Sequence, residues 1–157
     1  MLTEITICGR RESVGLDVQP RISWKIKSDR SDVMQTSFRI IVQDESHIVW
    51  DSGSVSSDRS IHVLYEGEAL APFTKYQVQV TAIDHYGDAH AGSASFETGM
   101  MTEENFKASW ITHTLPAEET APAVFCKDIK LEETPIRSAR IYATACGVYD
   151  ILLNGEK

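Results

Sequence analysis

Apolar and polar residues alternate with a period of two along short segments of the chain, and no long segment shows the apolar spacing of a helix. The clearest alternation runs from Lys75 to Asp84, where one face carries Tyr76, Val78, Val80 and Ala82. Two glutamines and a threonine lie on the opposite face. This pattern predicts a strand with one buried and one solvent-facing side, as in an antiparallel sandwich.

Six more segments before residue 100 predict strands by similar patterns, and clusters of Gly, Pro, Asp and Ser separate them. They are residues 5–8, 21–27, 37–43, 47–51, 61–65 and 94–98. In the second of these, Trp24 shares a face with Ile22 and Ile26, which indicates a core position. The sequence therefore predicts an all-β fold, with a first domain over residues 1–99.

The character of the chain changes after Gly99. Residues 100–122 are mostly polar and predict a linker or a short helical turn followed by a loop. Three strand patterns come next, at residues 123–131, at residues 139–145 and from Gly147 to Leu153. The Asn154-Gly155 pair then favours a type I′ hairpin turn, because that turn needs a positive φ at both central residues. We interpret residues 123–157 as the truncated start of a second β domain.

This second β domain is predicted to be incomplete. Three strands in so short a stretch cannot bury a core of their own, and the hairpin turn lacks a return strand. An unfinished sheet exposes unpaired N–H and C=O groups along Gly147 to Leu153. We therefore expect the chain to self-associate through this segment, by dimerisation or by strand exchange.

Charge and composition narrow the function classes. The net charge of −8 repels phosphate backbones, so nucleic acid is not an expected partner. The N-terminus lacks the basic and long apolar regions of a signal peptide, and no apolar run is long enough to span a membrane. Cys8, Cys126 and Cys146 are expected to be buried free thiols, which favours a cytoplasmic protein.

Some segments gather side chains with catalytic or metal-binding chemistry. The stretch from Asp84 to His90 holds two acids and two histidines, which fit either a metal site or a solvent-facing hairpin loop, and we favour the loop. On a strand, two adjacent acids would face opposite ways and could not converge on one substrate bond, and in a loop they are solvated charges. This interpretation applies to the three acidic pairs, Glu103-Glu104, Glu118-Glu119 and Glu132-Glu133. No residue is predicted to be catalytic, to bind a cofactor or to hold a metal.

Trp50 and Trp110 are the candidate contact residues. Both lie at the edges of predicted elements, near the presumed junction between the two domains. An aromatic ring in such a place either packs between domains or stacks on a sugar ring. We favour inter-domain packing, with carbohydrate contact as the alternative.

The strand around Tyr76 resembles a signature of the fibronectin type III fold, LxPxTxYxVxVxA. The matching residues are Leu70, Pro72, Thr74, Tyr76, Val78, Val80 and Ala82. The resemblance implies a fibronectin type III or immunoglobulin-like β-sandwich with a tyrosine corner. In such a corner the ring of Tyr76 packs inward, its hydroxyl bonds the backbone near Leu70 or Pro72, and Trp24 is the core tryptophan.

A second resemblance, to the N-terminal region of bacterial alpha-L-rhamnosidases, covers nearly the whole chain in order. Its motifs are Gly15-Leu16-Asp17, Pro20-Arg21-Ile22-Ser23-Trp24, Gln35-Thr36-Ser37-Phe38-Arg39-Ile40, Trp50-Asp51-Ser52-Gly53-Ser54-Val55 and Phe96-Glu97-Thr98-Gly99. Trp110-Ile111 and Leu153-Asn154-Gly155 resemble landmarks of the family's second, jelly-roll domain. Each motif is weak alone, and their order makes the case.

The resemblance implies a non-catalytic accessory region of an inverting glycoside hydrolase that removes terminal alpha-L-rhamnose. The family's two catalytic carboxyls lie in a downstream (α/α)6 barrel, which would be the partner of this region within the parent chain. Rhamnose-containing glycosides would be bound through the parent enzyme. The alternatives are a carbohydrate-binding module, which in this family sometimes uses calcium, and a protein–protein adhesion module.

Overall fold

The structure, a computed structural model, describes residues 1–114, 123–131, 135–136 and 138–157. The chain divides into two compact units, Met1–Trp110 and Ile111–Lys157. The first unit contains β1 (Leu2–Ile7), β2 (Glu12–Leu16), β3 (Arg21–Ile26), β4 (Gln35–Gln43), β5 (Ile48–Asp51), β6 (Val63–Leu64), β7 (Lys75–Asp84), β8 (Ala89–Thr98) and the 3-10 helix η1 (Glu103–Asn105). No helix long and apolar enough to cross a membrane occurs among the described residues.

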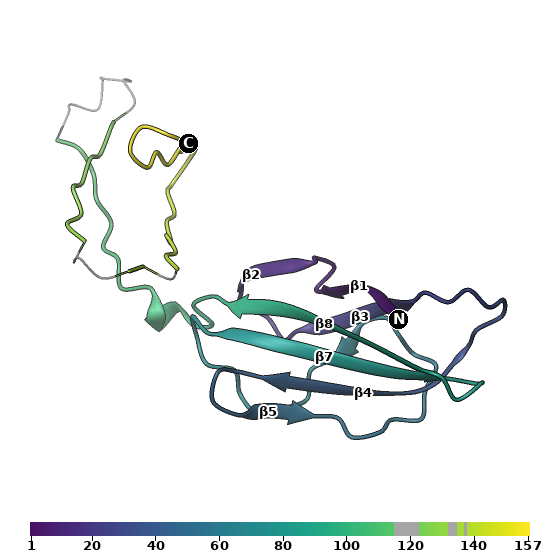
Figure 1. The fold of residues 1–157 in the computed structure, drawn as a ribbon. Coiled ribbons are helices and arrows are strands. Elements are labelled where there is room, and N and C mark those ends of the chain that lie inside the picture. Colours follow the sequence, from purple (N-terminus) through teal and green to yellow (C-terminus); the bar gives the residue numbers. More distant parts are fainter. Residues whose placement is uncertain (115–122, 132–134, 137) are drawn as a thin grey trace. The chain divides into compact units, whose positions relative to one another are not determined.

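Two sheets form the first unit, as Figure 1 shows. One has the strand order β1-β3-β6, and the other has the order β2-β8-β7-β4-β5. All neighbours are antiparallel except β2 and β8, which run parallel. The predicted all-β, immunoglobulin-like sandwich is therefore confirmed.

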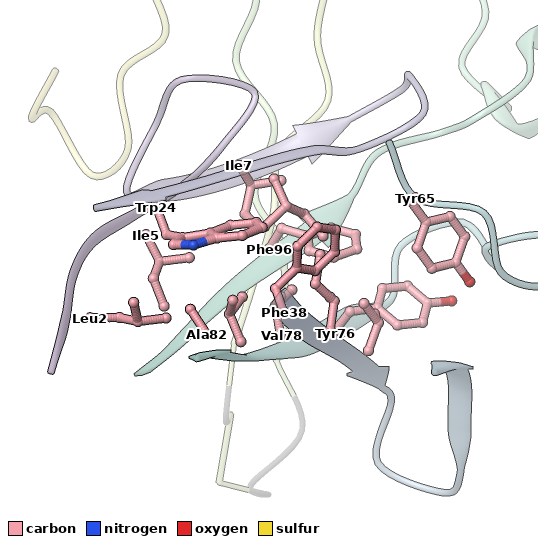
Figure 2. Close-up of a cluster of buried hydrophobic side chains, with 14 of the residues drawn as sticks. Leu2, Ile5, Ile7, Trp24, Phe38, Tyr65, Tyr76, Val78, Ala82 and Phe96 are labelled. Atoms are coloured by element: carbon pink, nitrogen blue, oxygen red, sulfur yellow. The ribbon is translucent and has the colours of Figure 1, made fainter. Parts of the chain in front are cut away.

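The core lies between the sheets and is built from the apolar faces that the period-two pattern predicted (Figure 2). Val78, Val80 and Ala82 of β7 are fully buried. Two ring contacts order the centre of this core: Trp24 meets Phe38 edge to face at 5.1 Å between ring centroids, and Tyr76 stacks on Phe96 at 5.2 Å. Burial of these residues supplies the main driving force for folding of the sandwich.

The tyrosine corner is present. The Oη atom of buried Tyr76 accepts a hydrogen bond of 2.8 Å from the backbone N–H of Ala71. Ala71 lies between Leu70 and Pro72, so the bond forms in the loop where the resemblance placed it. This interaction ties the entry loop of β7 to the core.

The sequence pattern did not predict strand β2, because a polar residue is buried in it and an apolar residue is exposed. Ser13 is buried and its hydroxyl donates to the carbonyl of Ile7 at 2.7 Å, whereas Val14 is half exposed. A buried serine beside an exposed valine does not read as an amphipathic strand. Parallel pairing with β8 is what holds this segment in place.

Strands β8 and β6 differ most in length from the predictions. Strand β8 begins at Ala89, five residues before its predicted start, because its first half contains small residues and a histidine instead of a large apolar face. Gly92 lies close to β1, because a Cβ there would come within 2.8 Å of Cδ1 of Ile5 and 3.0 Å of Cβ of Leu2. Strand β6 has only two residues, Val63 and Leu64.

The second unit forms no strand among its described residues, so the three strand patterns after residue 122 are not realised as paired strands (Figure 1). A strand is defined by a ladder of hydrogen-bonded neighbours, and within the described residues the only pairing of these segments is the isolated bridge between Leu153 and Glu156. Their apolar side chains are exposed, and Val148 is fully so. The predicted type I′ turn is confirmed, with φ of 53° at Asn154 and 86° at Gly155.

The three cysteines are free thiols, as expected, but their predicted burial is wrong. Cys8 is half-buried, and Cys126 and Cys146 are exposed. The latter two lie in the second unit, where the apolar segments that flank them have no core to enter.

The tyrosine corner can be tested by the substitution Tyr76→Phe. Loss of the bond from Ala71 should lower the free energy of unfolding by about 1 kcal/mol, because the buried ring is kept and a single hydrogen bond is removed. Urea denaturation measures this change. Tyr86→Phe, at an exposed tyrosine, is the matched control, and equal effects of the two substitutions would contradict the corner's role.

Candidate binding surface

A pocket of about 270 Å³ opens at one edge of the sandwich. Strand β5 lies at one edge of the five-stranded sheet, β6 lies at one edge of the three-stranded sheet, and the loop of residues 52–62 joins them. We call this hollow the edge pocket, and its lining residues are Phe38, Trp50, Asp51, Ser52, Val55, Arg59, Val63, Leu64 and Glu66. Apolar side chains from both sheets therefore share this hollow with charged ones.

A buried hydrogen-bond network fixes the loop that forms one wall of the edge pocket. The indole N–H of Trp24 donates to Oε1 of Gln35 at 2.8 Å. The Nε2 atom of Gln35 donates to the carbonyls of Ser57 and Arg59, both at 3.0 Å. The backbone N–H of Trp24 also donates to the carbonyl of Ser60 at 2.9 Å. The loop is thus anchored to the core tryptophan.

The side chain of Arg59 is held by its own loop. Its Nε donates to the carbonyl of Ile61 at 3.1 Å, and its Nη2 donates to the carbonyl of His62 at 2.8 Å. A guanidinium has five N–H donors, so these two bonds leave others available. Arg59 therefore presents a preorganised cation at the edge pocket.

Trp50 packs within the sandwich while also lining the edge pocket. Its ring meets Tyr65 edge to face at 5.3 Å between centroids, and the hydroxyl of Tyr65 donates to the carbonyl of Glu68 at 2.8 Å. Burial raises the pKa of Tyr65 to about 12. Gly67 is required beside this pair, because a Cβ there would lie 2.5 Å from Cβ of Trp50. Carbohydrate or inter-domain contact by Trp50 remains a prediction.

The Trp-Asp-Ser-Gly motif forms a turn in which the carboxylate of Asp51 is fully engaged in hydrogen bonds to Arg39 and Gly53. Nε of Arg39 donates to Oδ1 of Asp51 at 2.8 Å, and the guanidinium pairs with the second oxygen as well. The N–H of Gly53 donates to the same Oδ1 at 2.9 Å. Hydrogen bonding by Arg39 is the main reason why the pKa of Asp51 is lowered to about 2.

The Asp84 to His90 segment forms the β7–β8 hairpin, as expected, but two of its side chains are buried instead of facing water. Nε2 of His90 lies 2.8 Å from Oδ2 of Asp84, and both side chains are almost fully buried. Oδ1 of Asp84 accepts from the N–H groups of Tyr86 and Asp88, each at 2.9 Å. These bonds close the hairpin turn. Among the described residues, no group of three or more potential metal ligands gathers here or elsewhere.

Other predicted candidates lie at scattered positions. Trp110 is 71% exposed at the end of the first unit, so the structure does not place it with Trp50 in the edge pocket. Glu103 and Glu104 are exposed in η1. The pairs Glu118-Glu119 and Glu132-Glu133 lie outside the described residues.

Two sequence motifs meet at the end of the sandwich where the chain leaves it. The N–H of Gly99 donates to the carbonyl of Leu16 at 3.0 Å, and the N–H of Met101 donates to Oδ1 of Asp17 at 2.7 Å. A Cβ at Gly99 would clash with this carboxylate, so a larger residue there would displace the Asp17 side chain. Asp17 therefore fixes the direction in which the chain leaves β8.

Arg59 and Glu66 were not predicted as site residues. Each is a single charge in a polar loop, and no local pattern distinguishes it from a solvated residue. Only the crossing from β5 to β6 brings them to the same pocket as Trp50. A polar residue at the first position of β4, Gln35, was an available but unspecific signal of the network behind them.

The family model of the Rha78A-like, N-terminal immunoglobulin domain matches residues 2–102, which is more than half of the chain. The chain belongs to this family. The matched residues cover all eight strands of the sandwich, so the immunoglobulin domain and the first structural unit largely coincide. The predicted resemblance to the N-terminal region of alpha-L-rhamnosidases is confirmed.

The curated relatives that this chain resembles are much longer proteins. An alpha-L-rhamnosidase of Formosa agariphila is 28% identical over 159 residues, with 89% of this chain and 17% of the relative covered. One of Streptomyces avermitilis is 38% identical over 119 residues, with 71% of this chain and 12% of the relative covered. The chain thus spans less than a fifth of the length of these relatives.

Solved structures agree with the fold of the immunoglobulin domain. The Streptomyces avermitilis alpha-L-rhamnosidase complexed with L-rhamnose matches with a TM-score of 0.67 and 32% identity, over 71% of this chain and 12% of that chain. The alpha-L-rhamnosidase from Dictyoglumus thermophilum matches with a TM-score of 0.66 and 30% identity, over 71% of this chain and 14% of that one. The Aspergillus terreus enzyme, at 20% identity, supports the fold alone.

The buried Asp84–His90 pair predicts a pH dependence of the immunoglobulin domain's stability. Hydrogen bonding from His90 lowers the pKa of Asp84, and the two backbone N–H bonds lower it further against the opposing effect of burial. A carboxyl whose folded pKa is depressed stabilises the fold above its unfolded pKa of about 4. That stability is lost as the pH falls through the folded pKa.

We therefore expect Asp84→Asn to flatten the decline of the urea midpoint between pH 6 and pH 3, in addition to lowering the midpoint at pH 6. Asp58→Asn, in the exposed loop before β6, is the control and should keep the steeper decline of the unmodified chain. The same pH profile for the unmodified chain and for Asp84→Asn would show that this pair does not contribute.

Proposed function

We propose that this chain is a non-catalytic N-terminal accessory region of a glycoside hydrolase that removes terminal alpha-L-rhamnose. The observation that carries the proposal is the match of the sandwich to the N-terminal immunoglobulin domain of Rha78A-like proteins. The curated relatives are alpha-L-rhamnosidases of which the chain spans between 12% and 18% of the length. Most of each relative therefore lies outside the region that resembles this chain.

Four carboxyl groups of the sandwich have pKa values that do not suit a general acid. A glycosidase needs a general acid whose pKa is raised, so that it holds a proton near neutral pH. The pKa values of Glu4, Asp44, Asp51 and Asp84 are all shifted downward instead. Hydrogen bonds or nearby cations stabilise each of them in the charged form. These groups serve the fold.

A structural or substrate-positioning role is consistent with the way the sandwich is built. It closes a core of its own, and Asp17 sets the direction of the chain after β8 through its bond to Met101. A rigid module with a fixed exit can hold the next domain of a longer chain in a defined orientation. In this proposal its partner is the catalytic barrel of the parent chain, which would bind the rhamnose-containing glycosides.

The accessory role predicts that the isolated chain does not hydrolyse an aryl alpha-L-rhamnoside, whereas the parent enzyme does. Release of the chromogenic aryl group measures both activities. The proposal would be refuted by turnover of the isolated chain that disappears when one of its own acids, such as Asp51, is replaced by asparagine. A parent enzyme that is inactive on rhamnosides would refute the assignment of the substrate.

The second unit supports a further partner, a second copy of this chain. Its described segments expose many apolar residues, among them Val148, Tyr149, Ile151, Leu152 and Leu153. Extended segments with exposed apolar side chains and no ladder partner favour pairing with another strand. We propose that Gly147 to Leu153 mediates dimerisation or strand exchange.

Self-association can be measured by sedimentation velocity over a range of chain concentrations. We expect a dimer that dissociates on dilution, and Val148→Lys should shift the population toward monomer, because a charge at the paired segment opposes association. Val18→Lys, at an exposed valine of the sandwich, is the matched control and should leave the dimer unchanged. A strict monomer at high concentration would contradict the proposal.

We also propose that the chain is located in the cytoplasm. The support is chemical, because its three cysteines are free and two of them are exposed. Exposed thiols persist in a reducing compartment and are oxidised elsewhere.

A further inference from the structure

We propose that the edge pocket binds one neutral sugar ring. The pocket combines an aromatic side chain, apolar residues from both sheets and fixed polar groups, which is the combination that recognises a molecule with apolar C–H groups and several hydroxyls. This proposal does not rest on the proposed function, because binding is measured on the chain itself without any hydrolysis.

Trp50 supplies the aromatic wall of the site. Its ring is half-buried and is held by the contact with Tyr65 and by the close approach of Gly67. Its indole N–H donates no hydrogen bond to the described residues, so a donor is available beside the ring. A fixed ring with a free donor suits a sugar, because little conformational entropy is lost on binding.

Charges of both signs on the pocket wall decide the class of ligand. Arg59 is fixed by two carbonyls of its own loop, and Glu66 is exposed without a polar partner among the described residues. A sugar hydroxyl both donates and accepts, so neighbouring hydroxyls can bond a carboxylate and a guanidinium together. An anion such as phosphate would be repelled by Glu66 and by the net charge of −8, and a cation would be repelled by Arg59.

The size of the pocket limits the ligand to a single ring. Its volume of about 270 Å³ lies just below the range of roughly 300–1,000 Å³ that is common for drug-sized ligands. A small neutral ligand with few atoms binds weakly, so we expect a dissociation constant on the order of a few millimolar.

The test uses the three tryptophans of the chain as internal reporters. In a ¹⁵N–¹H correlation spectrum each indole N–H gives its own signal, and Trp50→Phe identifies the signal of Trp50. On titration with methyl alpha-L-rhamnopyranoside, the Trp50 signal should shift and saturate. The signals of Trp24, which is buried and bonded to Gln35, and of exposed Trp110 should stay in place.

Variants test the polar wall. Glu66→Ala should weaken binding about tenfold, because a charge-assisted hydrogen bond is lost, and the fold should be unaffected at this exposed, unpaired position. Glu12→Ala is the matched control and should bind normally, because Glu12 is exposed on β2, at the edge of the five-stranded sheet opposite to β5. Inorganic phosphate should leave the Trp50 signal unchanged.

Several results would overturn the proposal. The first is a Trp50 signal that does not move at sugar concentrations up to about 50 mM. The second is a shift of the Trp24 or Trp110 signal, either without a shift of Trp50 or equal to it. The third is a saturable shift of the Trp50 signal with phosphate. Equal binding by Glu66→Ala and Glu12→Ala would overturn the role of the carboxylate. None of these results bears on rhamnoside hydrolysis by the parent enzyme, so the two proposals fail separately.

Discussion

Burial of the core tryptophan, Trp24, depends on the hydrogen bond from its indole N–H to the side-chain amide of Gln35. Both partners are buried, so the bond satisfies a donor that would otherwise cost about 1–3 kcal/mol in the core. The same amide donates to the loop that carries Arg59. One side chain thus connects the packing of the core with the wall of the edge pocket.

The motifs that mark the family have structural roles in this chain. The carboxylate of Asp51 is engaged by Arg39, and that of Asp17 accepts the backbone N–H of Met101. Tyr76 spans from the core to the loop at Ala71. These residues place turns and fix the direction in which the chain leaves the sandwich. Arg59 and Glu66, two polar residues that line the edge pocket, lie outside these motifs.

The two units differ in how their backbones are satisfied. In the sandwich, strands from distant parts of the sequence pair with each other, as β4 does with β7 and β7 with β8. The described segments of the second unit have similar apolar patterns but no ladder partner, and their side chains stay exposed. A segment with an alternating apolar pattern can therefore form a strand, but it does so only when a neighbouring segment supplies the backbone hydrogen bonds.

The sequence by itself determined the features that depend on neighbouring residues. Alternation located β7 and the buried face around Trp24, and the Asn154-Gly155 pair specified a turn with two positive φ angles. The tertiary structure alone decided strand β2, where burial of Ser13 reverses the pattern, and the burial of His90 against Asp84. It also decided the edge pocket, because only the crossing from one sheet to the other brings Arg59 and Glu66 to the pocket that Trp50 lines. Local patterns report which face a side chain takes, whereas its partner is set by residues far away in the chain.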